Sequence, residues 1–264
     1  MACAAAVAGC QESGFDERRE TARPLKVQHV LGESKVPGQA ERPATLTIDA
    51  LDVALALDVR PVRAAVPRLE LPAYLREPAA GVELMHPLSE ADLPALEAAD
   101  PDLIVGGDAG ETLFAGLSAI APTVITEEGG GLWKLNVRLV GEALGRTNDA
   151  EALLTGYDRR VARVRRSLSG KPRVAVARIT ANGLRFAGPD SFASTVLADA
   201  GARRVVRNEP GADVDVMLLS AAPGESIAGV DGSFERVDDA TWWGPGGVHA
   251  ARAALADLQR ILQE

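Results

Sequence analysis

The sequence predicts an α/β protein with two Rossmann-like lobes that are joined by a single long backbone helix. Two features lead to this prediction. Short apolar strands alternate with helical segments in both the first and the last part of the chain, which is typical of parallel sheets covered by helices. Between these parts, hydrophobic residues recur at helical spacing from Leu132 to Leu168. We therefore expect a lobe at 25–128, a linking helix at 129–168 and a shortened second lobe at 169–264.

In the first lobe, apolar runs bounded by Gly, Pro or charged residues predict short strands. These strands are expected at 25–33, 42–47, 59–66, 82–84, 101–107 and 122–127. Asp49 and Ser89 are suitable N-cap residues for helices that follow two of the strands. The helices are expected from Asp49 to about Asp58, from Ser89 to Ala99, and in a short segment through Leu113 and Leu117.

The predicted linking helix has a weak point at Gly145, after which Thr147 can restart it. Alternation of strands and helices then returns in the second lobe. Its strands are expected at 173–179, 184–186, 215–220 and 234–239, and the first two can pair with each other. Its helices are expected from Asp190 or Ser191 to Ala200, and from Gly246 to Leu262.

Charge and composition exclude several classes of function. The formal net charge of −9 argues against a nucleic-acid partner, because nucleic acids bind to basic surfaces. No stretch reaches the roughly 18 consecutive apolar residues that a membrane-spanning helix needs. Both cysteines, Cys3 and Cys10, precede the folded part, so that part has neither a disulfide nor a cysteine metal site. The three histidines are widely spaced, which excludes a structural zinc site of the usual spacing.

The first residues have a pattern of their own. Val7-Ala8-Gly9-Cys10 resembles a bacterial lipobox, in which an aliphatic residue and two small residues precede a cysteine that carries lipid. The basic segment and long apolar core of a complete signal are missing from the printed sequence. We therefore interpret 1–24 as a truncated lipoprotein signal followed by a polar tether, with Cys10 as the lipidation site.

Several segments, taken in order, carry a resemblance to a known family. They are "LPAYLREPAAGVEL", "PDLIVGG", "LSAIAPTV", "LVGEALGR", "GPDSFASTVLADAG" and "VDDATWW". Together they resemble the iron–siderophore solute-binding lipoproteins of ABC importers, from about Leu25 to the end of the chain. The resemblance implies a two-lobed, monomeric binding protein rather than an enzyme. Its ligand would be a ferric siderophore, its partner an ABC permease, and its place the extracytoplasmic face of the cell membrane.

A cleft between the lobes is the expected binding site, since ligands of open α/β sheets bind at the carboxyl ends of the strands. A ferric siderophore already supplies the ligands of its iron, so the protein needs guanidinium donors and aromatic surfaces, but no cofactor and no metal ligands of its own. The resemblance places the corresponding segments in the cleft. The candidate ligand-binding residues are Tyr74, Arg76, Trp133, Arg178, Arg185, Ser191, Trp242 and Trp243.

The resemblance also implies one acidic residue on each lobe that docks to the permease. Glu90 and Asp92 are the first-lobe candidates, because Pro94 occupies the expected position, and Glu209 is a stand-in in the shortened second lobe. Alternative ligands on the same fold are cobalamin, haem or a bare metal ion held with the help of His86 or His249. A degenerate surface protein that binds a partner without transport is the alternative from another class.

Overall fold

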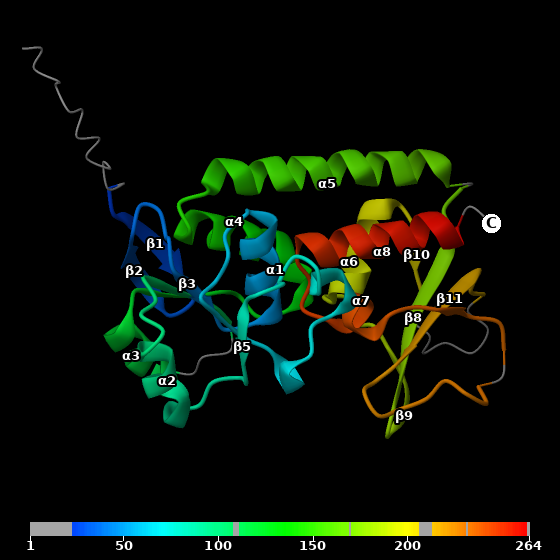
Figure 1. Cartoon of the computed structure of the whole chain (residues 1–264). Helices are drawn as coiled ribbons and strands as arrows, with labels where there is room; N and C mark the ends of the chain where they lie inside the picture. The colour runs from blue at the N-terminus through cyan, green and yellow to red at the C-terminus, as the bar shows by residue number, and fades with distance from the viewer. Residues whose placement is uncertain (1–22, 108–110, 169, 206–212, 231, 263–264) are drawn as a thin grey trace, which may run out of the picture.

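The computed structural model describes residues 23–107, 111–168, 170–205, 213–230 and 232–262. These residues form two α/β lobes, each built on a largely parallel sheet, as the sequence predicts. Figure 1 shows the first sheet on the left, the second on the right, and the helix α5 (Thr147–Ser167) running across both. Residues 1–22, which include Cys10, and residues 206–212, which include Glu209, lie outside the described part.

The first lobe has five parallel strands in the order β5-β4-β3-β6-β7. They are β3 (Pro43–Thr45), β4 (Arg63–Ala65), β5 (Glu83–Met85), β6 (Leu103–Gly106) and β7 (Thr123–Ile125). The helices between them are α1 (Ile48–Ala56), α2 (Leu93–Glu97) and α3 (Glu111–Ile120). β3, β6 and β7 are entirely buried, which explains why their sequences are mostly apolar and do not alternate between apolar and charged residues.

Three first-lobe details differ from the sequence prediction. The strand expected at 25–33 is an antiparallel hairpin of β1 (Leu25–His29) and β2 (Gly32–Val36), in which Gly32 has a φ of 132° that favours glycine at the reversal. α1 begins after Thr47, so Asp49 lies within its first turn instead of capping it. The helix after Ser89 is a short 3₁₀ turn followed by α2, although Ser89 does form the capping box with Asp92.

The linking region consists of two helices, α4 (Trp133–Ala143) and α5, which are separated at the predicted weak point. Gly145 has a φ of 71°, and a Cβ at this position would lie 2.0 Å from the carbonyl oxygen of Gly38. A larger residue is therefore excluded both by conformation and by space. α4 packs against α1 of the first lobe, and α5 extends to the helices of the second lobe.

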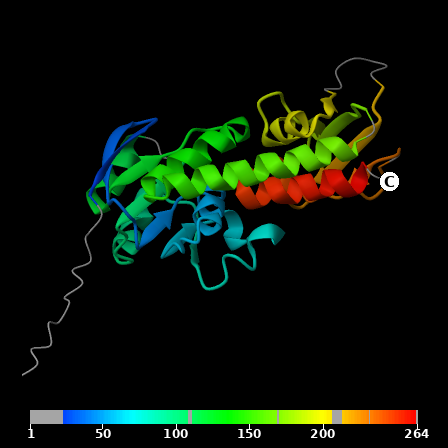
Figure 2. The ribbon, with the colours of Figure 1, turned by 90° about the horizontal axis from the view of Figure 1, so that it is seen from above.

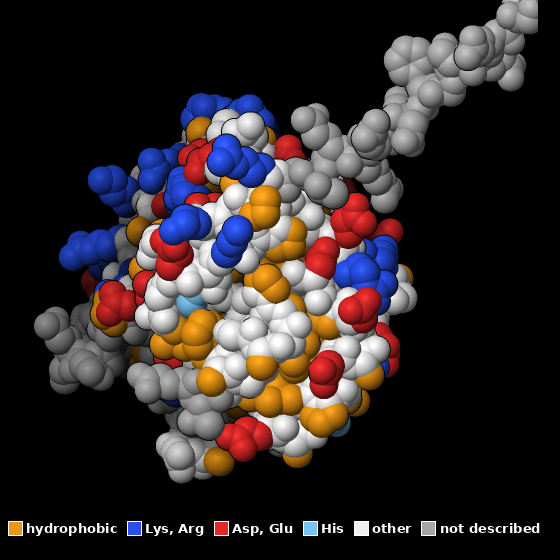
Figure 3. All heavy atoms as spheres, turned by 90° about the vertical axis from the view of Figure 1, so that its left-hand side faces the viewer, with side chains coloured by type: hydrophobic (Ala, Val, Ile, Leu, Met, Phe, Trp, Pro, Cys, Tyr) orange, Lys and Arg blue, Asp and Glu red, His pale blue; other side chains and the backbone are white. Residues whose placement is uncertain are grey.

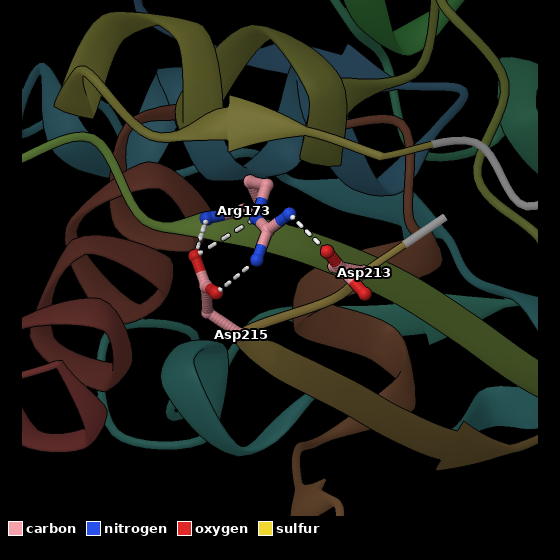
Figure 4. A network of polar contacts seen from close by, with 3 residues as sticks. All are labelled: Arg173, Asp213 and Asp215. Atoms are coloured by element: carbon pink, nitrogen blue, oxygen red, sulfur yellow. Dashed lines mark hydrogen bonds and ion pairs between the residues drawn. The ribbon is translucent and has the colours of Figure 1, made fainter. Parts of the chain in front are cut away.

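The second sheet has the order β10-β8-β11-β12, with β9 paired antiparallel to β8. Its strands are β8 (Arg173–Thr180), β9 (Gly183–Phe186), β10 (Arg203–Arg204), β11 (Val216–Ala221) and β12 (Glu235–Arg236). Its helices are α6 (Phe192–Ala200), α7 (Asp239–Trp243) and α8 (Val248–Ile261). The sequence did not predict β10 and α7. At the start of β8, the exposed Arg173 pairs with Asp213 at 3.2 Å and with Asp215 at 2.8 Å, which fixes the entry to the neighbouring strand (Figure 4).

One hydrophobic core runs through both lobes and the linking helices. It includes Val53 of α1, Val137 of α4, Val161 of α5, Val196 of α6 and Leu258 of α8, all nearly inaccessible to solvent. Seen from above, α5 and α8 lie side by side along the length of the molecule (Figure 2). Since such a shared core must be disrupted when the lobes part, the two lobes form one packed unit.

The molecular surface is mixed in character. On the end face of the first lobe, hydrophobic side chains are scattered among uncharged ones, and charged side chains of both signs surround them (Figure 3). Within the part of the chain that the structure describes, no helix combines the length and the apolar character that crossing a membrane requires.

A buried carboxylate connects the lobes. Asp52 of α1 has no solvent exposure, and it accepts hydrogen bonds from the backbone N–H groups of His249 at 2.8 Å and Ala250 at 3.0 Å. The ring Nδ1 of His249 lies 3.1 Å from the same carboxylate. Because these N–H groups are at the beginning of α8, Asp52 caps a second-lobe helix from the first lobe. Gly247 permits this contact, since a Cβ there would lie 2.4 Å from Asp52 Cγ.

We predict that Asp52→Asn destabilises the protein by about 1.5–3 kcal/mol, the range for a hydrogen bond to a charged group. The asparagine amide would place an NH₂ group against an N–H donor at the start of α8. Urea unfolding of the variant and the parent measures the difference. Asp190→Asn, at an exposed carboxylate, is the matched control and should unfold like the parent. Equal stability of Asp52→Asn and the control would contradict this role of Asp52.

Candidate ligand-binding cleft

An open cavity lies between the two sheets, at the carboxyl ends of their strands. It has two halves with volumes of about 500 and 420 Å³, which share Ile48, Pro67 and Pro245 in their walls. The first half is lined mainly by residues that follow the strands of the first sheet. The second half is lined on one side by first-lobe residues between Pro67 and Arg76, which follow β4, and on the other by second-lobe residues on β8 or after β11 and β12. This is where open α/β sheets bind ligands.

The first half of the cavity is mainly apolar with an acidic border. Asp49, Glu127 and Glu128 are the charged residues among those described that line it. Asp49 is almost fully buried, and this burial raises the pKa of its carboxyl above the ordinary value. The hydroxyl of Thr126 is also buried and finds no hydrogen-bond partner within the described residues. Asn136 of α4 holds the loop by bonding the backbone N–H and carbonyl of Glu127.

The second half contains the guanidinium groups and the aromatic surface that the sequence predicts. It brings together four of the eight predicted ligand-binding residues, namely Tyr74, Arg76, Arg178 and Trp243. Arg68 lies there as well, so three arginines face three acidic residues, Glu70, Asp238 and Asp239. The hydroxyl of Tyr74 is buried without a partner among the described residues, and burial raises its pKa. An anionic ligand would therefore find its donors in this half.

Arg178 and Arg185 both lie close to the Trp243 ring. They are direct partners in the antiparallel pairing of β8 and β9. Their guanidinium carbons lie 5.5 and 6.0 Å from the centre of the Trp243 ring, within the range of cation–π contacts. Two positive charges therefore lie beside one aromatic ring, but only Arg178 lines the cavity, whereas Arg185 is exposed and lies outside the cavity walls.

Arg178 already has a protein partner. One of its terminal nitrogens lies 2.7 Å from Oδ2 of Asp239, and Oδ1 of Asp239 accepts a hydrogen bond from the Ser220 hydroxyl at 2.9 Å. Desolvation raises the pKa of Asp239 even though Arg178 and Ser220 act in the opposite direction. The sequence does not predict Asp239 as a residue of the site, because its partner Arg178 is 61 positions earlier in the chain. The "DDAT" pattern at 238–241, which fits a helix N-cap, was the available signal.

The other predicted ligand-binding residues lie outside the cavity walls. Trp242 is buried and donates its Nε1–H to Asp257 of α8 at 3.0 Å. Trp133 is buried with its ring edge-on to Tyr157 and Phe192. Ser191 caps α6 by accepting a hydrogen bond from the N–H of Ser194. These three residues have structural partners, in contrast to the expectation that they face the ligand.

The remaining candidate residues lie apart from the cavity. Glu90 and Asp92 lie in the short 3₁₀ turn before α2, where Asp92 is bonded to Ser89. His86 is exposed, and His249 is in contact with Asp52. Among the residues that the structure describes, no group of three or more His, Cys, Asp or Glu side chains is placed to hold a metal ion.

We predict different effects for the two arginines on stability. Arg178→Ala leaves the half-buried Asp239 without its cation, so the melting temperature should fall by several degrees. Arg185→Ala removes an exposed side chain and should melt like the parent. Thermal unfolding followed by circular dichroism checks both variants. A parent-like melting temperature for Arg178→Ala would show that its ion pair contributes nothing to the fold.

Comparison with known proteins connects this geometry to a family. Residues 76–222 match the family model described as periplasmic binding protein. The chain is 25% identical over 294 residues to the probable siderophore-binding lipoprotein YfiY of Bacillus subtilis, covering 94% of this chain and 90% of that protein. It is 32% identical over 170 residues to the achromobactin-binding periplasmic protein of Dickeya dadantii, covering 61% and 55% of the two chains.

Solved structures share the fold. Staphylococcus aureus SirA, in its complex with staphyloferrin B, aligns with a TM-score of 0.74 at 23% identity, over 89% of this chain and 97% of that one. The petrobactin-binding protein YclQ of Bacillus subtilis aligns with a TM-score of 0.72 at 18% identity, over 92% and 99% of the two chains. At such identities the likeness establishes the two-lobed fold. With a family match over more than half of its length, the chain belongs to the periplasmic binding protein family.

Proposed function

We propose that this protein is an extracytoplasmic binding protein that captures a ferric siderophore and delivers it to an ABC importer. The observation that carries the proposal is the group of Tyr74, Arg76, Arg178 and Trp243 in the second half of the cleft, where the Arg178 guanidinium lies 5.5 Å from the centre of the Trp243 ring. The names of the curated relatives, one a siderophore-binding lipoprotein and one an achromobactin-binding protein, support the same ligand class. The proposed role is binding, without catalysis.

The chemistry of the cleft suits a pre-formed iron complex. Iron in a siderophore is already coordinated, so the protein only has to recognise the outer oxygen atoms and the apolar surface of the complex. Arginine donates to such oxygens from a rigid, always-charged plane, and tryptophan offers a broad apolar face. The three arginines of the second half balance its three acidic residues, so an anion meets no net negative charge there despite the net charge of −9 of the whole chain.

The connection between the lobes limits their movement in this proposal. Asp52 caps α8 across the lobe boundary, and the core is continuous through α4, α5 and α8. Closure around a ligand would therefore be a small adjustment rather than a wide hinge motion. Glu90, Asp92 and Glu209 remain the proposed permease-docking residues, and the protein is proposed to act as a monomer.

We predict that the purified protein binds at least one anionic ferric siderophore. The test is quenching of tryptophan fluorescence, confirmed by calorimetry, against a panel of catecholate, carboxylate and hydroxamate ferric complexes. Cobalamin, haemin and free Zn²⁺, Mn²⁺ and Fe³⁺ form the comparison set, and they should bind no more tightly than to a generic acidic protein. Stoichiometric binding of a member of the comparison set, with none of the siderophores bound, would overturn the proposal.

The proposed lipid anchor at Cys10 gives a separate prediction. The chain is expressed in a bacterium with the basic segment and apolar core of a lipoprotein signal added before Met1, so that both Cys3 and Cys10 are kept. The parent should partition into detergent with the membrane fraction, whereas Cys10→Ser should be released or remain unprocessed, because a thiol is needed to carry the lipid. Cys3→Ser is the control and should behave like the parent. A Cys10→Ser chain that is processed and partitions into detergent like the parent would rule out this anchor.

A further inference from the structure

The ion pair between Arg178 and Asp239 lies within the second half of the cleft, and both residues line it. All of its components belong to the second lobe, because Arg178 is on β8, Ser220 on β11 and Asp239 on α7. The pair is therefore present whatever small adjustment the two lobes make. A ligand that approaches Arg178 meets a guanidinium that already has an anionic partner.

The contact is one that a ligand can replace. Side-chain exposure of Arg178 and Asp239 is 23% and 20%, so solvent and ligand can reach both groups. Only one terminal nitrogen of Arg178 is hydrogen-bonded to Asp239, and its Nε is buried without a partner among the described residues. The guanidinium thus keeps donors that Asp239 does not use, and an anion that binds both terminal nitrogens would satisfy it better than the single carboxylate oxygen does.

The charges that line the second half of the cleft single out Asp239 as the partner of Arg178. The second half is lined by three arginines and three acidic residues, so its formal charges cancel. Asp238 is the acidic neighbour of Asp239, but its carboxylate is engaged elsewhere, since it accepts bonds from the N–H and hydroxyl of Thr241 at the start of α7. Of the two adjacent carboxylates, Asp239 is the one that forms an ion pair with Arg178.

We propose that Asp239 is a specificity-determining residue that competes with the ligand for Arg178. This inference rests on the proposed function. In the empty cleft, Asp239 occupies a donor that an anionic ferric complex has to use. A multiply charged complex displaces the carboxylate from Arg178, whereas a neutral complex has only weak acceptors and leaves the pair intact. Asp239 therefore sets how much charge a ligand must carry before Arg178 contributes to its binding.

The test measures the affinities of the parent, Asp239→Asn, Arg178→Ala and the double variant for three ferric complexes. Ferric enterobactin is a multiply charged catecholate complex, ferric citrate is a carboxylate complex, and ferrichrome is a neutral hydroxamate complex. Asp239→Asn keeps an acceptor for Ser220 but removes the competing charge. This variant should have a roughly tenfold higher affinity than the parent for the anionic complex that the parent binds. Its affinity for ferrichrome should be nearly unchanged. Arg178→Ala should lower the anionic affinity by roughly ten- to a hundredfold. In the double variant, which combines Asp239→Asn with Arg178→Ala, the affinity for the anionic complex should rise little above that of Arg178→Ala alone.

Asp238→Asn is the matched control, because it removes the same charge from the neighbouring position and asparagine caps helices about as well as aspartate. It should raise the anionic affinity much less than Asp239→Asn. An equal gain in both variants, or a gain that persists without Arg178, would show a general charge effect and overturn the inference. Unchanged or weaker binding by Asp239→Asn would overturn it as well.

A second variant provides for the case that Asp239→Asn melts below the assay temperature. Ser220→Ala removes the hydroxyl that holds the other oxygen of Asp239, so it should raise the anionic affinity in the same direction by a smaller factor. Failure of the parent to bind any complex in the panel would refute the proposed function itself. Binding by the parent without these gains would leave that function standing and refute the role of Asp239.

Discussion

The buried carboxylate of Asp52 determines how the two lobes are held together. It belongs to a first-lobe helix, yet its hydrogen-bond donors are backbone N–H groups at the start of the last helix. A buried carboxylate is costly unless it is hydrogen-bonded, and the free N–H groups of a helix start satisfy it. The same segment also shapes the cleft, because Pro245 lines both halves and Gly246 fits closely against Phe192 and Trp133.

Much of the fold could be predicted because its signals are local. Ser191 caps α6, the linking helices break at Gly145, and β9 pairs back onto β8, each as the nearby residues indicate. The errors occur where contacts distant in sequence decide the outcome. The hairpin at Gly32 packs on β7, and α7 is a short helix that packs against α6 and α8. Short helices and strands contain too few residues for the spacing of hydrophobic residues to predict them.

The candidate site was predictable in its residue types but not in its side-chain directions. Tyr74, Arg76, Arg178 and Trp243 meet in one half of the cleft, as expected for residues that follow strands. Trp242 and Trp243 are adjacent, and on a helix adjacent side chains face different ways, so one is buried against α8 and the other borders the cavity. Sequence alone does not show which. Nor does it show that Asp239 pairs with Arg178, since the pairing depends on the parallel order of the second sheet.

The long sequence separation between Asp52 and its donors has a consequence for the order of synthesis. The carboxylate and the N–H groups of His249 and Ala250 are 197 and 198 positions apart. Ribosomes make a chain from its N-terminus, so Asp52 emerges long before the helix that it caps. Until then the Asp52 carboxylate is exposed to water, so this contact between the two lobes can form only after almost the whole chain has been made.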